Sequence, residues 1–139
     1  MRRFFCYILL ILISLSGFAQ KQNQMYFEQV SMDQGLSQVS INSIIQDSTG
    51  FLWFATLDGL NRYDGYTFKV FKPSASDPTS ISTNRILCLY LDSYGKIWIG
   101  TLGGGLNEYN PITETFTHYM YDPKNPNSLS NNDVYDIVE

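Results

Sequence analysis

Hydrophobic and polar positions after residue 20 form short runs separated by turn residues. Helical repeats would need long runs with apolar residues three and four positions apart, and the sequence contains none. Short runs rich in branched and aromatic residues, bounded by Gly, Pro, Asn and Asp, are typical of β-strands. We therefore predict two sets of four strands: Ile41–Gln46, Leu52–Thr56, Leu60–Tyr63 and Thr67–Phe71, then Arg85–Leu91, Ile97–Thr101, Leu106–Tyr109 and Thr115–Tyr119.

The two sets of strands are copies of one repeat. Asp47–Leu57 and Asp92–Leu102 share Asp, Ser, Gly, Trp, Thr and Leu in the same order, so Trp53 corresponds to Trp98. Other stretches return in the same phase: Gly59–Tyr63 as Gly105–Tyr109, Phe68–Phe71 as Phe116–Tyr119, Asp77–Ser82 as Asn125–Ser130, and Gly35–Ser37 as Ser80–Ser82. Asn132–Val138 is then expected to begin a third set, as Asn84–Leu91 begins the second.

Tight turns join the predicted strands within each repeat. Asp47–Gly50 and Asp92–Gly95 are interpreted as hairpin turns, because Asp bonds nearby backbone amides and Gly adopts positive φ. Asp64-Gly65 and Asn110-Pro111 mark the next turn of each repeat. Four strands in a period in the mid-forties are typical of a β-propeller blade. The sequence thus predicts an all-β fold of four-stranded antiparallel blades over residues 20–139.

About two blades and the start of a third are present, which makes the predicted propeller incomplete. Propellers usually close with about 4–8 blades, so the chain is expected to be a piece of a longer protein. The run Leu52–Ala55 does not alternate, as in a strand covered on both faces. Trp53 and Trp98 are therefore interpreted as core residues between blades, and a sugar-binding platform is the alternative.

The first 19 residues have the pattern of a secretory signal peptide. Arg2 and Arg3 precede the apolar run Phe4–Leu15, and the small residues of Ser16–Ala19 lead to a predicted cut before Gln20. A membrane anchor is the alternative, but a span needs roughly 20 apolar residues and this run is shorter. We predict residues 1–19 as a signal peptide and the remainder as exported.

Composition and charge narrow the choice of partners. Hydrophobic residues make up 44% of the chain and charged residues 16%, which argues against disorder. The formal net charge is −4, and removal of Arg2 and Arg3 makes it more negative, so no contact with nucleic acid is expected. Cys6 leaves with the signal, and Cys88 is interpreted as a small buried strand residue rather than a reactive thiol.

No residue stands out as catalytic or metal-binding. His118 is the only histidine and is interpreted as a solvent-facing residue of an outer strand. Gly103–Gly105 precedes a strand and lacks the Lys-Ser/Thr ending of a phosphate-binding loop, so it is interpreted as a turn. Asp47 and Asp92 recur at equivalent places, which favours a turn role over a catalytic pair. We predict no cofactor and no metal, and the ligand-binding residues are not identified.

The motifs Gly-Leu-Ser, Asp-Ser-x-Gly-x-x-Trp and Gly-Leu-Asn-x-Tyr together resemble the two-component regulator propeller repeat. The resemblance covers roughly Tyr26 to Glu139. Its matching stretches are Gly35–Ser37, Asp47–Trp53, Gly59–Tyr63, Asp92–Trp98 and Gly104–Tyr109. Ala55 departs mildly from the usual Trp-Ile-Gly-Thr form, which Trp98–Thr101 keeps. The start of the chain resembles the N-termini of hybrid two-component sensors from gut and environmental Bacteroidetes.

The resemblance implies a periplasmic input region that senses breakdown products of polysaccharides. In such a protein a membrane span, a histidine kinase, a receiver and often a DNA-binding domain would follow. The full-length form would then be an inner-membrane, homodimeric kinase working by phosphorelay, whereas this segment is predicted not to be an enzyme. Its expected partners are an oligosaccharide and the rest of its own chain.

Two other functions stay open from the residues alone. A secreted propeller lectin or polysaccharide-active enzyme would carry its catalytic part beyond residue 139, in a clustered His/Asp/Glu pocket of later blades. A free-standing scaffold for protein contacts is the third. Fold does not decide among them, and the repeat resemblance favours the sensor.

Overall fold

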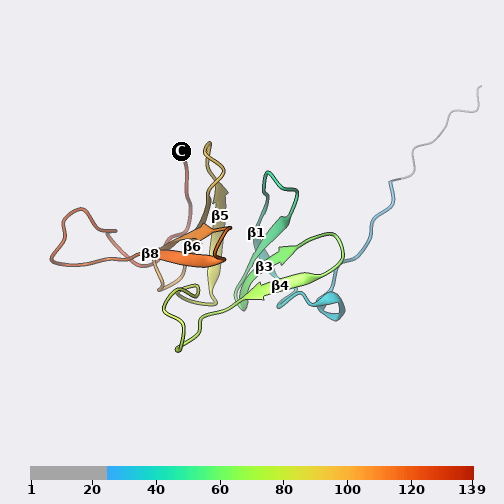
Figure 1. Ribbon diagram of the computed structural model, residues 1–139, viewed down its shortest axis with the longest axis horizontal. Coiled ribbons are helices and arrows are strands. Elements are labelled where there is room, and N and C mark those ends of the chain that lie inside the picture. The colour runs from blue at the N-terminus through green and yellow to red at the C-terminus, as the bar shows by residue number, and fades with distance from the viewer. Residues whose placement is uncertain (1–24) are drawn as a thin grey trace, which may run out of the picture.

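The computed structural model describes residues 25–139, which form two four-stranded antiparallel sheets lying side by side (Figure 1). The predicted signal peptide and Cys6 lie outside the described residues. The first sheet contains β1 (Ile41–Gln46), β2 (Leu52–Thr56), β3 (Gly59–Tyr63) and β4 (Phe68–Phe71). The second contains β5 (Ile86–Leu91), β6 (Ile97–Thr101), β7 (Leu106–Asn110) and β8 (Thr115–Tyr119). We call them blade 1 and blade 2.

Each blade is a meander with its strands paired in chain order. The registers repeat: Trp53 lies opposite Arg62 in blade 1, and Trp98 lies opposite Glu108 in blade 2. The innermost pair carries the same irregularity in both blades, between Ile41 and Ser43 and between Ile86 and Cys88. The predicted all-β fold is therefore confirmed, and the predicted strand ends differ from the observed ones by at most one residue.

The hydrophobic core lies between the two blades. Trp53 is 1% exposed, and its ring lies 5.8 Å from Phe71 and 4.8 Å from Tyr109 of blade 2. Burying a large apolar side chain contributes about 1.5–3 kcal/mol, so blade-to-blade packing is a main source of stability. The cluster combines residues of both sheets and of the connection between them: Trp53, Ala55, Leu60, Phe71, Ile81, Ile86, Leu89, Ile97, Ile99, Tyr109 and Phe116.

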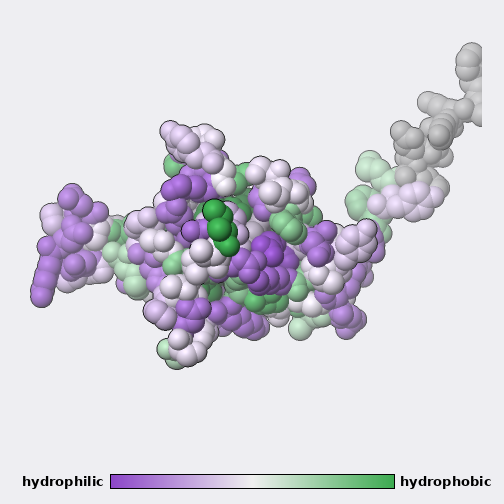
Figure 2. Space-filling view, viewed as in Figure 1, coloured by the Kyte–Doolittle hydropathy of each residue, from purple (hydrophilic) through white to green (hydrophobic). Residues whose placement is uncertain are grey.

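Polar contacts join the innermost strands of the two blades. The side-chain amide of Asn42 donates to the carbonyl of Ile86 at 2.8 Å, and the amide of Leu89 donates to Ser43 Oγ at 3.2 Å. The face seen in Figure 2 is a mixture of hydrophilic and intermediate residues with smaller hydrophobic patches between them. The two blades are thus held together by the hydrophobic core and by hydrogen bonds between their innermost strands.

A buried asparagine holds the chain where it enters each blade. In blade 1 the amide of Ser37 donates to Asn61 Oδ1 at 2.9 Å, and Asn61 Nδ2 donates to Ser37 Oγ at 2.8 Å. In blade 2 the amide of Ser82 donates to Asn107 Oδ1 at 3.0 Å, and Asn107 Nδ2 donates to Ser82 Oγ at 2.8 Å. Both asparagines are fully buried, where an unpaired amide would be costly. We call this pair of bonds the entry clasp.

The strand predicted at Asn132–Val138 is not formed. The segment does begin like its counterpart in blade 2, since the carbonyl of Asn132 accepts from Gly105 as the carbonyl of Asn84 accepts from Gly59. A strand needs a neighbouring strand to supply its hydrogen bonds. Among residues 25–139 no further strand lies beside this segment, so it stays irregular.

Candidate functional site

The repeated aspartate ties a hairpin turn to the tryptophan of the same blade. Asp47 Oδ1 accepts from the amides of Thr49 at 2.9 Å and Phe51 at 3.1 Å, and Asp47 Oδ2 accepts from Trp53 Nε1 at 2.8 Å. Burial alone would raise the pKa of Asp47, but these bonds together hold it below its ordinary value. The carboxylate is therefore fully engaged within its own turn.

Asp92 repeats this arrangement in blade 2. Its Oδ2 accepts from Trp98 Nε1 at 2.9 Å, and its Oδ1 accepts from the amides of Tyr94 and Lys96 at 2.9 and 2.8 Å. The bond from Trp98 is the main cause that lowers the pKa of Asp92. The predicted turn role of Asp47 and Asp92 is confirmed. The bond to the indole was not predicted, although the fixed Asp-to-Trp spacing in both repeats was a signal for it.

A cavity of about 230 Å³ lies between the turn ends of the two blades. Arg62 lines it and spans the boundary: its Nη1 donates to the Tyr109 hydroxyl at 3.2 Å and its Nη2 lies 3.1 Å from Glu114 Oε1. The guanidinium also lies 4.7 Å from the centre of the Phe51 ring. Burial is the main cause that raises the pKa of Tyr109. The guanidinium of Arg62 is therefore engaged by a hydrogen bond to Tyr109 and an ion pair with Glu114.

Trp53 lines this cavity but does not offer a ring face to a ligand. Phe71 and Tyr109 pack against it, and the side chain is almost fully buried. Its predicted place in the core between blades is confirmed, and the sugar-platform alternative fails for this residue. Trp98 occupies the same place on the far side of blade 2, where it is only half-buried and lines a second cavity of about 260 Å³ with Tyr90, Leu106 and Ile137.

His118 is not the solvent-facing residue that the sequence predicted. It is half-buried, and its Nε2 lies 2.8 Å from the carbonyl oxygen of Ser80, to which it donates. The connection between the blades folds back across β8 and covers the imidazole, a contact over 38 residues that no local pattern reveals. His118 thus anchors the connection of blade 1 to blade 2.

Cys88 is buried, as predicted, and burial is the main cause that raises the pKa of its thiol. Gly103–Gly105 forms the predicted turn, which connects β6 to β7. The amide of Gly103 donates to Asp133 Oδ1 at 2.7 Å. No cluster of three or more His, Cys, Asp or Glu side chains that could hold a metal ion occurs within residues 25–139. Over the same residues, no helix is long and apolar enough to cross a membrane.

The two repeats match a known family at the motifs described above. Residues 35–58 and 80–103 match the family described as "Two component regulator propeller". Both matches run from the entry clasp through the Asp-to-Trp turn to the turn after β2 or β6. Both segments are thus similar to the two-component regulator propeller repeat.

Two of the proteins similar to this chain are much longer than the stretch they share with it. The chain is 44% identical over 78 residues to "Histidine kinase P4" from Formosa agariphila. The aligned stretch covers 56% of this chain and 6% of that protein. It superposes with a TM-score of 0.71 at 43% identity on the extracellular domain of the putative hybrid two component system BT3049 from B. thetaiotaomicron, over 76% of this chain and 15% of that one.

A second solved structure of an extracellular domain is also similar to this chain. The extracellular domain of the putative hybrid two component system BT4673 from the same organism gives a TM-score of 0.56 at 27% identity, over 72% of this chain and 14% of that one. The regulator propeller repeats described here therefore span about a seventh of the extracellular domains that they match.

Proposed function

We propose that this chain forms part of the periplasmic sensor region of a hybrid two-component signal-transduction protein. The observation that carries the proposal is the 43% identity, at a TM-score of 0.71, to the extracellular domain of a putative hybrid two component system. The two in-phase blades, packed through Trp53 and Tyr109, support the proposal because propellers are built by repeating four-stranded blades. The full-length protein would carry the kinase and would work as a homodimer.

The proposed stimulus is an oligosaccharide released from a polysaccharide. The resemblance to regulator propellers of Bacteroidetes sensors supports this class of ligand, and the predicted signal peptide supports a periplasmic location. Within residues 25–139 the polar groups of the cavity beside Arg62 and Asp47 bond one another. The sugar contacts are accordingly expected on loops of other blades of the proposed sensor region.

The first test is the coding sequence after the codon for Glu139. Further in-phase repeats followed by a membrane span and a helical kinase core would support the sensor. A stop codon, or an unrelated catalytic domain, would contradict it.

The second test measures ligand binding by the whole extracellular region. Oligosaccharides prepared from plant and host polysaccharides are screened by thermal shift and then by calorimetry. One structural class is expected to raise the melting temperature and to induce transcription that depends on the intact gene. Equal responses to all sugars, or to none, would contradict the proposed stimulus.

A further inference from the structure

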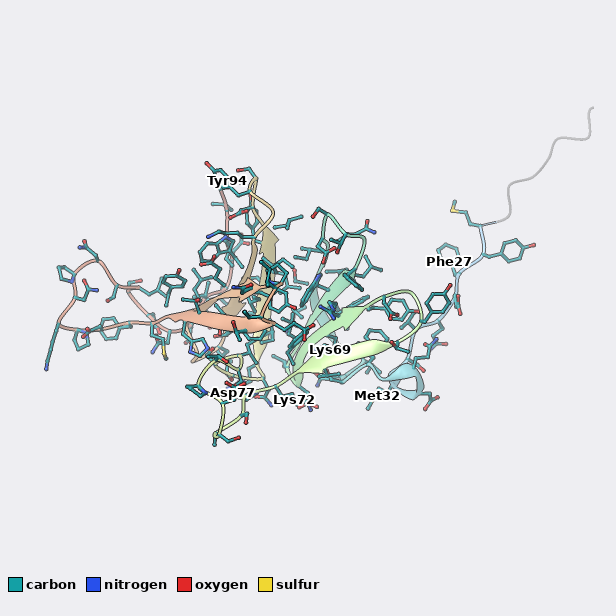
Figure 3. The ribbon with its side chains drawn as sticks, in the orientation of Figure 1. Phe27, Met32, Lys69, Lys72, Asp77 and Tyr94 are labelled. Atoms are coloured by element: carbon teal, nitrogen blue, oxygen red, sulfur yellow. The ribbon has the colours of Figure 1, made fainter. Side chains whose placement is uncertain are left out.

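Two cations lie directly opposite each other on the face of blade 1 that meets blade 2. Arg62 of β3 pairs with Lys69 of β4 in the strand register, and Trp53 of β2 lies on the other side of Arg62 on the same face. Lys69 belongs to the outer strand of the blade (Figure 3). Like charges directly opposite each other on a sheet are destabilising. We call Arg62 and Lys69 the cation pair.

One carboxylate of blade 2 binds both cations. Glu114 Oε1 lies 3.1 Å from Arg62 Nη2, and Glu114 Oε2 accepts a hydrogen bond from Lys69 Nζ. The bond from Lys69 is the main cause that lowers the pKa of Glu114. Within residues 25–139 these are the two ion pairs that the cation pair forms. The charge that offsets the cation pair therefore comes from the neighbouring blade and not from blade 1.

The backbone at Glu114 has an uncommon conformation. Its φ is 56°, in the left-handed region, and over residues 25–139 every other residue with a positive φ is a glycine. Strands β7 and β8 also pair one residue further than β3 and β4, since Asn110 lies opposite Thr115. Strain of this kind persists where the surrounding structure requires a particular geometry. At this position the geometry brings the carboxylate of Glu114 against blade 1.

The equivalent positions of blade 2 carry different charges. Glu108 and Thr117 occupy in blade 2 the register positions that the cation pair occupies in blade 1. Glu108 is neutralised inside its own blade, because its carboxylate accepts from Lys96 Nζ at 2.6 Å and from the Tyr119 hydroxyl at 2.9 Å. Blade 2 therefore offers no pair of cations to an acid of another blade at this position.

The turn of blade 1 has no acid in the place of Glu114. Two positions before the first phenylalanine of the outer strand, blade 2 has Glu114 and blade 1 has Tyr66. A second copy of blade 1 would therefore present a neutral side chain to the cation pair. A second copy of blade 2 would instead bring its own glutamate toward Glu108, which is already neutralised. Each mismatch leaves an uncompensated charge between blades.

We propose that the bridge from Glu114 to the cation pair determines blade order: it selects blade 2 as the neighbour of this face of blade 1 and rejects a second copy of either blade. Apolar packing discriminates less, since Trp98 and Leu106 of blade 2 are the equivalents of Trp53 and Leu60. Specificity between similar partners requires contacts that disfavour the wrong partner. Unpaired cations or facing acids supply that penalty.

Melting temperatures of the whole extracellular region test the bridge. Glu114→Gln is expected to lower the melting temperature by a few degrees, because the cation pair loses its carboxylate. Lys69→Glu is expected to lower it in the native background, where the new acid faces Glu114. In the Glu114→Gln background the same change is expected to raise it, because it supplies the missing acid beside Arg62. An effect of the same sign in both backgrounds would overturn the proposal.

A matched control and a salt series separate charge from turn geometry. Glu108→Gln removes an acid whose ion pair lies inside blade 2, so Lys69→Glu is expected to lower the melting temperature in that background as in the native protein. The deficit of Glu114→Gln is expected to shrink at about 1 M sodium chloride, which screens charges. A deficit that salt leaves unchanged would show that Glu114 acts through the turn alone and would overturn the proposal.

A turn exchange tests the selection of the neighbour. Replacing residues 110–115 by residues 64–67 gives blade 2 the turn that a second copy of blade 1 would present. The exchange is expected to lower the melting temperature by several degrees, and Lys69→Glu is expected to restore part of the loss. No gain from Lys69→Glu would overturn the proposal. If the exchanged protein does not fold, the sign of Lys69→Glu in the point variants decides. These melts involve no sugar, so their outcome is independent of the proposed stimulus.

Discussion

At the scale of single residues, the Asp-to-Trp bond is the contact that the repeat copies most faithfully. Asp47 and Asp92 bond two turn amides and one indole each, at almost the same distances. In blade 1 the turn thereby holds the indole of Trp53, which packs on Tyr109 of blade 2. The Asp47 turn is therefore tied through Trp53 to the contact between the two blades.

Asp47→Ala in the whole extracellular region is expected to destabilise it by about 1–3 kcal/mol, because the indole N–H and two amides lose their acceptor. Urea denaturation followed by tryptophan fluorescence measures the change. Ser48→Ala in the same turn alters an exposed side chain and is the control. Equal midpoints for the two variants would contradict the role of the carboxylate.

The loss of folding stability at low pH should depend on the carboxylates of Asp47 and Asp92. The pKa of Asp47 and that of Asp92 lie below the ordinary value in the folded state. Their contribution is therefore fully present above about pH 4 and is lost as the pH falls through the folded-state pKa. Asp47→Asn combined with Asp92→Asn is expected to weaken the loss of stability between about pH 4 and pH 2. An unchanged pH profile of the urea midpoint would contradict this.

At the scale of elements, the two blades differ where β1 and β5 meet their neighbours. Ser43 lies opposite Ala55 in blade 1, and Cys88 lies opposite Gly100 in blade 2. A methyl group at Gly100 would collide with Cys88 Sγ and would lie 2.8 Å from the carbonyl oxygen of Val134. The departure of Ala55 from the usual glycine is thus compatible with the smaller residue opposite it.

Gly100→Ala is expected to destabilise the whole region by about 1–3 kcal/mol through overpacking. The double variant Gly100→Ala with Cys88→Ala removes the sulfur and should recover part of the loss. Thermal melts of the two single variants and the double variant measure the coupling. Strictly additive effects would show that Cys88 and Gly100 do not share one packing site.

The elements could be predicted from the sequence because their signals are local. Asp and Gly at fixed places set the turns, and the strand ends followed within one residue. The contacts that the sequence did not reveal are long-range: Ser37 with Asn61, Arg62 with Tyr109, and His118 with Ser80. The strand predicted at Asn132–Val138 failed for a related reason, since strand formation depends on a partner outside the local run.

At the scale of the whole molecule, both outer faces of the blade pair resemble its interior. The outer face of blade 1 carries Leu52, Phe54, Tyr63 and Phe68, and the outer face of blade 2 carries Trp98 and Leu106. Both faces are rich in large apolar side chains, like the covered faces between the blades. Stability in repeat folds is shared between each unit and its neighbours. Within residues 25–139, the two blades therefore have one covered interface and two outer faces with no further sheet against them.

A fragment of residues 20–139 is accordingly expected to unfold without a cooperative thermal transition, whereas the whole extracellular region shows one. Circular dichroism melts and calorimetry of both proteins measure the difference. A sharp, reversible transition of the monomeric fragment would contradict the expectation and would show that a single blade interface is sufficient.

The entry clasp also bears on how such a protein gains and loses repeats over generations. Ser82, in the connection before blade 2, is bonded to Asn107 of β7, 25 residues later. The repeating unit that contains all of its own contacts therefore includes this connection as well as the four strands of the sheet. Duplication or loss of genetic material between any two equivalent points, in a connection or within a strand, would restore every clasp. The break points of such a recombination need not coincide with the ends of a sheet. As far as the clasps are concerned, only the length of the exchanged segment is constrained, and it must equal one whole repeat.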